Sequence, residues 1–199
     1  MSKKNATANV KKTPNSYADV GGANQDIKKQ VQAAALKLTQ SKQGVNKNIE
    51  EAFKTLSEIC NKDANISAAF KYRGSCYNIM GDFQRALYDY SVAIKIAKEE
   101  NEDPKILAEY YSMAGVQHYE LGQLDEALKH YDMSIEKDNS NGMFYYNRGL
   151  VHSRLDKVEK AIEDYTNALK SMTGEADHTY QVRFNRGICY RRMGPNFLD

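Results

Sequence analysis

The chain has 199 residues, of which 41% are hydrophobic, and its formal net charge at pH 7 is only +2. This length suits one domain or a short array of repeats with a buried core. The low charge argues against a protein that binds nucleic acid through bulk electrostatic attraction. No apolar run is long enough to cross a membrane, and the N-terminus lacks the apolar core of a secretory signal.

Residues 1–24 form a basic, polar segment. It contains no acidic residue before Asp19, four lysines, and residues that break helices: Lys3, Lys4, Lys11, Lys12, Pro14, Gly21 and Gly22. Such a segment buries too little apolar surface to offset the entropy lost on ordering. We therefore expect residues 1–24 to be a disordered tail, ordered only where a neighbouring chain holds it.

Two helices are expected next, over residues 25–43 and 46–60. Apolar side chains recur at helical spacing in both, imperfectly in the first and clearly in the second. These side chains are Ile27, Val31, Ala34, Leu36 and Leu38, followed by Ile49, Ala52, Phe53, Leu56 and Ile59.

From residue 67 onward the sequence repeats itself. Gly115 and Gly149 are 149 − 115 = 34 residues apart, and several other positions keep this spacing. Each copy has a glycine in its first predicted helix, and alanine, tyrosine and another small residue in its second. The matching sets are Gly74, Ala86, Tyr90 and Ala93; Gly115, Ala127, Tyr131 and Ser134; and Gly149, Ala161, Tyr165 and Ala168. Gly187 opens a fourth copy.

These residue types have a physical reason. Glycine and alanine allow two helices to approach closely, and the tyrosines fill the remaining space. A helical hairpin of this size cannot bury its apolar face alone, so successive copies must stack. The pattern resembles the tetratricopeptide repeat. The resemblance implies an all-α fold, a right-handed α-solenoid of stacked antiparallel helix pairs.

The resemblance divides the chain into about three clear copies and an incomplete one, at residues 67–104, 105–141, 142–177 and 178–199. Counting 34 residues back from Ala86 reaches Ala52, so residues 25–66 are expected to be a degenerate leading copy, with Gln40 where the other copies have glycine. We expect the apolar side of Tyr180–Met193 to be covered by further chain of a longer protein or by a partner.

Seven additional residues separate the first and second clear copies, because 115 − 74 = 41. Seven residues are close to two helical turns. We therefore expect them to lengthen the second helix of the first copy without rotating its face. The pair Asp103-Pro104 then predicts a helix start, with the aspartate as cap and the proline at the first position.

No motif for catalysis or for a cofactor is found, so we expect neither an enzyme nor a bound cofactor. His118 and His152 hold the same position in adjacent copies, where other copies have Tyr77 and Tyr190. This equivalence indicates packing rather than metal binding. The three cysteines show no paired spacing and are expected to be buried thiols in a reducing compartment: Cys60, Cys76 and Cys189.

The resemblance also implies a binding groove on the concave side, lined by residues of the first helix of each copy. These residues are Lys71, Asn78, Val116, Tyr119, Tyr146, Leu150, Arg154, Phe184, Ile188, Arg191 and Arg192. Their apolar members would form a floor with arginines at one edge. The expected guest is a helix or extended peptide with apolar anchors and some acidic side chains. Alternatively, other elements of a longer chain, or the tail, fill the groove.

One branch of the family binds the carboxylate ends of heat-shock chaperones through a clamp of Lys, Asn, Asn, Lys and Arg. Here Lys71 matches, but Ser75 and Met113 stand where the two asparagines belong. A clamp that starts one copy later keeps Asn147 but places Ser112 at its first lysine. We therefore do not expect chaperone-tail binding.

Two functions stay open. The first is a non-enzymatic scaffold for protein–protein interaction, expected in the cytoplasm. The second is a permanent architectural subunit of a large assembly, for example ciliary or cytoskeletal, whose neighbours occupy groove and tail. Recognition of single-stranded RNA is disfavoured, because the related RNA-binding arrays differ in period and present polar residues to the bases.

Overall fold

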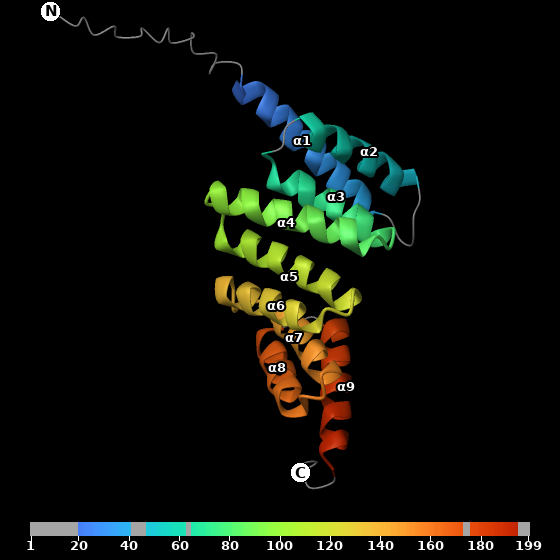
Figure 1. Ribbon diagram of the computed structural model, residues 1–199, viewed down its shortest axis with the longest axis vertical. Coiled ribbons are helices and arrows are strands. Elements are labelled where there is room, and N and C mark those ends of the chain that lie inside the picture. The colour runs from blue at the N-terminus through green and yellow to red at the C-terminus, as the bar shows by residue number, and fades with distance from the viewer. Residues whose placement is uncertain (1–19, 41–46, 63–64, 173–175, 195–199) are drawn as a thin grey trace, which may run out of the picture.

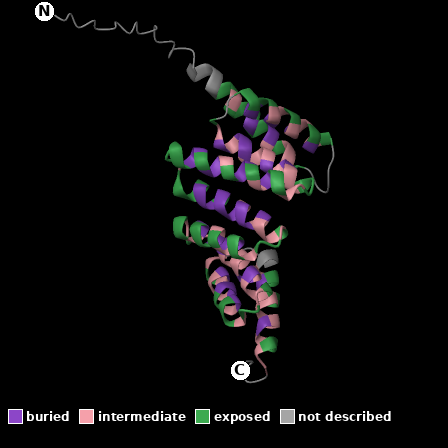
Figure 2. Ribbon diagram, viewed as in Figure 1, coloured by how far each residue is buried: buried purple, intermediate pink, exposed green. Residues whose placement is uncertain are grey.

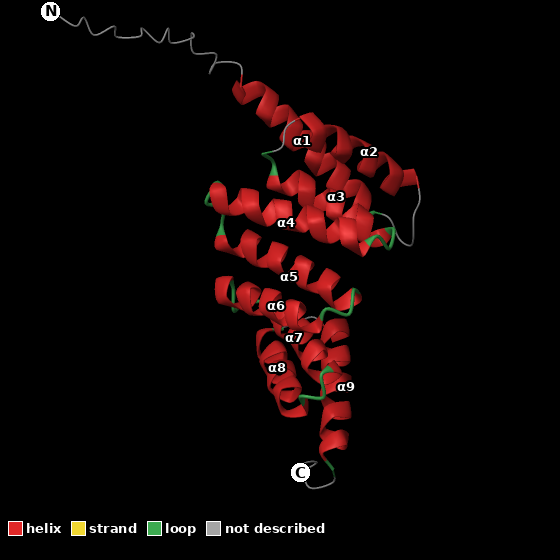
Figure 3. Ribbon diagram, in the orientation of Figure 1, coloured by secondary structure: helices red, strands yellow, loops and turns green. Residues whose placement is uncertain are grey.

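The computed structural model describes residues 20–40, 47–62, 65–172 and 176–194, and Figures 1 and 3 show these residues forming helices without strands. The helices are α1 (Val20–Thr39), α2 (Lys47–Lys62), α3 (Ser67–Ile79), α4 (Phe83–Glu99), α5 (Pro104–Glu120), α6 (Leu124–Lys137), α7 (Gly142–Arg154), α8 (Val158–Ser171) and α9 (Ala176–Met193). None of these helices is long and apolar enough to span a membrane. Residues 1–19, most of the predicted tail, lie outside the described part.

The helices pack as consecutive hairpins. The pairs α3–α4, α5–α6 and α7–α8 each contact one another, and α4–α5, α6–α7 and α8–α9 join one hairpin to the next. Figure 1 shows the hairpins in one continuous stack from α1 at the top to α9 at the bottom. The predicted all-α solenoid of helix pairs is confirmed.

Close contact between a glycine and a tyrosine explains why the two helices of each hairpin fit. A Cβ atom added to the glycine would lie 2.8 Å from Cε1 of the tyrosine in all three clear copies: Gly74 with Tyr90, Gly115 with Tyr131, and Gly149 with Tyr165. The tyrosines are almost fully buried. The predicted close approach therefore holds in these copies. At Gly187 in α9, no atom of the described residues lies within 4 Å of an added Cβ.

Buried residues concentrate along the middle of the stack, where α5 has the most (Figure 2). The largest apolar cluster runs from α1 to α5, and two smaller clusters serve the helices from α5 to α9. All three cysteines are free and buried, as predicted: Cys60, Cys76 and Cys189.

The seven additional residues do not all lengthen α4, as the sequence had predicted. By repeat position, α4 ends three residues later than α6 and α8, while α5 begins four residues earlier than α3 and α7. Asp103 accepts a hydrogen bond from the Lys105 amide and Pro104 occupies the first turn, so the predicted helix start is correct. The cap thus divides the insertion, and each helix gains about one turn.

The leading hairpin follows the predicted positions in α2 and, except near its C-terminal end, in α1, where Val31 and Ala34 are buried and Ile27 and Leu38 pack against the core. Ala52, Leu56 and Ile59 of α2 are buried, as their spacing indicates. In contrast, Leu36 is 58% exposed, and Gln40 lies exposed beyond the end of α1. The helix also begins at Val20, inside the segment predicted to be a tail. The C-terminal end of α1 therefore departs from the predicted pattern.

Candidate binding surface on the first helices

The predicted groove residues lie on a surface formed by α3, α5, α7 and α9, here called the first-helix surface. At its N-terminal end, Lys71 on α3 forms an ion pair with Glu109 on α5, with Nζ and Oε2 3.0 Å apart. The same ammonium group lies 5.9 Å from the centre of the Tyr110 ring. Lys71 is therefore engaged in joining α3 to α5. Asn78, the other predicted residue on α3, is half-buried.

The middle of the surface joins α5 to α7. The Arg154 guanidinium lies 5.1 Å from the centre of the Tyr119 ring, a distance suited to a cation–π contact. Val116 and Tyr119 are half-buried and pack against the apolar cluster that contains Tyr131. Each of these side chains is therefore partly buried in the core and partly exposed to solvent.

The next contact joins α7 to α9. Asn185 donates a hydrogen bond from Nδ2 to the Tyr146 hydroxyl over 3.2 Å. Partial burial raises the pKa of Tyr146 above its usual value, so the hydroxyl stays protonated and can also donate. Tyr146 and Leu150 pack against the cluster around Tyr165, and both are half-buried. These predicted apolar side chains of α5 and α7 therefore pack against two separate clusters and are only partly exposed.

The most exposed apolar side chains of this surface lie on α9. Phe184 is 54% exposed, and its ring stacks on that of Tyr180, which is 70% exposed, with centroids 6.4 Å apart. Ile188, one turn further along the helix, is half-buried. Tyr180 was not among the predicted residues. Its spacing of four from Phe184 on one helix was the available signal.

The three predicted arginines have different environments. Arg192 donates from Nη1 to the Ser153 hydroxyl over 3.2 Å, and its guanidinium pairs with Asp156, so it ties α9 to the end of α7. Arg154 lies on Tyr119, as described above. Arg191 is exposed and has no acidic side chain within ion-pair distance among the described residues. Of these three side chains, Arg191 is thus the one available to an anionic group.

The two histidines singled out from the sequence are held by neighbouring side chains. His118 Nδ1 lies 2.6 Å from Gln123 Oε1, and His152 Nδ1 lies 2.9 Å from Asp164 Oδ2. Among the residues with described positions, no group of three or more His, Cys, Asp or Glu side chains could hold a metal ion. Their contacts are those of packed, hydrogen-bonded side chains.

Comparison with known proteins agrees with this architecture. The family described as TPR repeat matches residues 115–156, the stretch that contains the second glycine–tyrosine pair and the third glycine. The chain therefore contains a tetratricopeptide repeat (TPR). It is 31% identical over 100 residues to the small glutamine-rich tetratricopeptide repeat-containing protein of Dictyostelium discoideum. That alignment covers 50% of this chain and 27% of the relative, so this TPR chain spans about a quarter of the relative's length.

Solved structures show the same fold at low identity. MamA superposes with a TM-score of 0.67 at 17% identity, covering 86% of this chain and 84% of that one. YrrB, described as a TPR protein with an unusual peptide-binding site, superposes with a TM-score of 0.63 at 16% identity, covering 87% of this chain and 81% of its own. At these identities the likeness establishes the fold of the TPR array.

Proposed function

We propose that this TPR protein is a non-enzymatic interaction scaffold that binds a segment of another protein on the first-helix surface, between α5 and α9. The observation that carries this proposal is the exposed Tyr180–Phe184 stack on α9, with Arg191 about two turns further along the same helix and without an acidic partner among the described residues. A large exposed apolar patch beside charged groups is typical of a binding surface. The description of YrrB as a peptide-binding TPR protein supports the same use of this fold.

The chemistry of the surface specifies the partner. Tyr119, Tyr146 and Leu150 are half-buried and offer a partner small apolar contact areas. Phe184 offers a larger one, because more than half of its surface is exposed. Arg191 favours a carboxylate. The partner is therefore a helix or extended peptide with aromatic or aliphatic anchors and at least one acidic side chain. The free, buried cysteines suit a reducing compartment such as the cytoplasm.

Selection from a displayed library of random peptides tests the proposal. The wild-type chain should enrich peptides with apolar and acidic residues, whereas Phe184→Ser and Arg191→Glu should each lose most of this enrichment without lowering the melting temperature. Tyr88→Ser is the matched control, because Tyr88 is 66% exposed but lies on α4, a second helix. The proposal fails if Phe184→Ser selects the same peptides as the wild type, or if Tyr88→Ser alone loses them.

A permanent place in a larger assembly is a second candidate. The observation that favours it is the open space at Gly187, whose counterparts in the three clear copies are each filled by a tyrosine. A neighbouring helix would fit there, whether it comes from the same polypeptide or from another. Light scattering of the isolated chain separates the candidates: a soluble monomer favours the reversible scaffold, and persistent association of chains favours the assembly subunit.

A further inference from the structure

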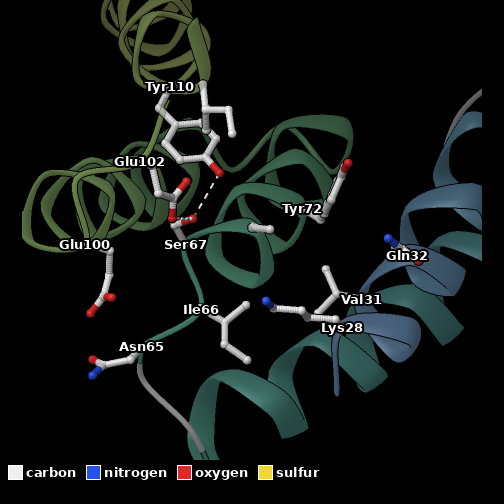
Figure 4. Close-up of a pocket in the computed structure, with 12 residues that line it drawn as sticks. Lys28, Val31, Gln32, Asn65, Ile66, Ser67, Tyr72, Glu100, Glu102 and Tyr110 are labelled. Atoms are coloured by element: carbon white, nitrogen blue, oxygen red, sulfur yellow. Dashed lines mark hydrogen bonds between the residues drawn. The ribbon is translucent and has the colours of Figure 1, made fainter. Parts of the chain in front are cut away.

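A pocket of about 690 Å³ lies away from the surface between α5 and α9, at the opposite end of the array. It opens between α1, the start of α3 and the start of α5 (Figure 4). A volume of this size is within the range of pockets that hold small ligands or several peptide residues, about 300–1,000 Å³.

The two walls of this pocket are the two places where the chain departs from its repeat. One wall contains Glu100, Glu102 and Ile106, which belong to the seven-residue insertion and the early start of α5. The opposite wall is formed by Lys28 and Val31 of α1, the first helix of the degenerate leading copy. Figure 4 shows Glu100 and Glu102 on one side of the pocket and Lys28 and Val31 on the other. The pocket therefore depends on the insertion and the leading copy and is not a feature of each copy.

The insertion makes its wall acidic. Its residues 99–103 read Glu-Glu-Asn-Glu-Asp. The Ser67 hydroxyl donates to Glu102 Oε1 over 2.5 Å and lies 3.1 Å from the Tyr110 hydroxyl, which fixes Glu102 at the pocket. Burial raises the pKa of Tyr110 to about 12, so its hydroxyl remains neutral at physiological pH. Glu100 is exposed and has no ion-pair partner among the described residues.

The floor of the pocket provides apolar and aromatic contacts. Ile66 and Ala68 line it together with the half-buried ring of Tyr72, and Val31 and Ile106 add apolar surface from the two walls. An extended peptide that combines lysines with an apolar residue matches this arrangement, because carboxylates bind the ammonium groups and aromatic faces attract cations.

We propose that residues 1–19 of this same chain dock in the pocket, with Val10 on the apolar floor and Lys11 and Lys12 against the acidic wall. This segment carries four lysines and one acidic residue, Asp19, so its charge is opposite to that of the wall. It directly precedes the helix that forms the other wall. Docking would cover the N-terminal end of the first-helix surface at Ala68 and leave the surface between α5 and α9 open to a partner.

The length of the segment permits this contact. Lys28 is eight residues beyond Val20, or about 12 Å along a helix at about 1.5 Å per residue. Eight residues of extended chain, as between Lys12 and Val20, span up to about 26 Å at about 3.3 Å per residue, about twice the distance from Val20 to Lys28, so Lys12 can reach back beyond the α1 wall into the pocket. Attachment to α1 also gives the segment a high effective concentration at the pocket, which favours it over a free peptide of the same sequence.

Paramagnetic broadening in the full chain tests the proposal. A nitroxide is attached at Thr7→Cys, since the three native cysteines are buried. At low salt, the amide signals of Ile66, Ala68 and Ile106 should broaden strongly, and that of Ile162 on α8 should not. Glu100→Lys should weaken this broadening roughly two- to fivefold, as expected for a solvent-exposed ion pair. Glu163→Lys is the matched control, because Glu163 is an exposed glutamate on α8.

Two further experiments complete the test: reversal of charges, and mixing of spin-labelled chains with separate isotope-labelled chains. Lys11→Glu with Lys12→Glu should lose the broadening, and adding Glu100→Lys to that double variant should restore part of it. Equal broadening at Ile66 and Ile162 in the wild type would overturn the proposal, as would an unchanged signal in Glu100→Lys. Broadening that arises only between a spin-labelled chain and a separate isotope-labelled chain would also overturn it, because the segment would then dock in a second copy.

Discussion

The second clear copy differs from its two neighbours along the contact between its own helices. In the first copy, Arg73 Nη2 donates to Asp89 Oδ1 over 2.7 Å, and Asp89 is 1% exposed. The third copy repeats this pair, with Arg148 and Asp164 at the same repeat positions and the same 2.7 Å contact. In the second copy these positions hold Ala114 and His130. There the His130 ring lies 4.6 Å from that of His118.

All three copies nevertheless keep the same glycine–tyrosine contact of 2.8 Å. The buried ion pair is therefore not required to set the fit of the two helices, and close packing around glycine does that. The polar contact is an addition that two copies have and one lacks. The second copy also holds Gln117 at a core position where its neighbours have Cys76 and Val151. This copy should accordingly differ in stability and in its response to pH.

Removing a buried aspartate should have the largest effect. Asp164→Ala leaves the Arg148 guanidinium half-buried without that partner, and we expect the loss of about 3–5 kcal/mol in the free energy of unfolding. Asp132, whose Oδ1 lies 2.7 Å from Arg148 Nη1, limits the loss to the lower part of that range. Chemical denaturation measures it. His130→Ala at the same position of the second copy is the control and should cost less; an equal or greater cost there would contradict the distinction between the copies.

An added methyl group at the packing glycine should destabilise a clear copy but not α9. Gly149→Ala drives a Cβ into the buried Tyr165 ring, so we expect a loss of about 1–3 kcal/mol despite the better helix propensity of alanine. Gly187→Ala meets no atom of the described residues and should instead gain about 0.5–1 kcal/mol in local helix stability. Thermal melts monitored by circular dichroism, with hydrogen exchange of α9, measure both. A loss at Gly187 equal to that at Gly149 would show that α9 is covered like the other first helices.

Replacing Gln117 should raise stability. Its Oε1 is buried without a hydrogen-bond partner, and its Nε2 makes only a long contact of 3.5 Å with the Met113 carbonyl oxygen. Gln117→Met keeps the volume and removes the unsatisfied groups, so we expect a gain of about 1 kcal/mol. Urea denaturation at pH 7 provides the measurement. Val151→Met in the third copy is the control, where overpacking should give no gain. Destabilisation by Gln117→Met would mean that the amide has a partner.

The smallest effect should be the pH dependence of the second copy. Burial lowers the pKa of His130 below its usual value of 6.5, and the neighbouring His118 adds to this, while Glu126 opposes it. The unfolded chain therefore binds the proton more readily, and stability should fall as the pH drops below about 6.5. His130→Gln should reduce this fall, measured as urea midpoints between about pH 7 and about pH 5. Identical pH profiles of the variant and the wild type would contradict it.

The repeat ladder made the fold predictable because its residue types act locally. Glycine, alanine and tyrosine at fixed spacing specify a hairpin, so the contacts of Gly74 and Gly149 followed from the sequence. The division of the insertion between α4 and α5 did not, because it depends on where α4 ends, and no capping residue marks Glu99. The pocket depends on both walls at once, and α1 has no repeat positions from which to place Lys28.

For the candidate surface, the sequence pattern assigned residues to the first helices but could not give the exposure of each side chain. Spacing placed Tyr146 and Phe184 on the same side of the array, but exposure depends on the adjacent helix. Tyr146 is partly covered because α9 lies beside α7, whereas Phe184 has no following helix among the described residues to cover it. The pairing of Arg192 with Asp156 likewise required the turn after α7, whose geometry the sequence pattern does not specify.

Site-specific photo-crosslinking tests the central claim most directly. A benzophenone amino acid replaces Phe184 on the first-helix surface in one chain and Tyr88 on α4 in another, and each is irradiated with a peptide selected on the wild-type chain. Binding on the first-helix surface predicts a covalent adduct at position 184 and none at position 88. An adduct at position 88 alone, or equal yields at the two positions, would contradict the account.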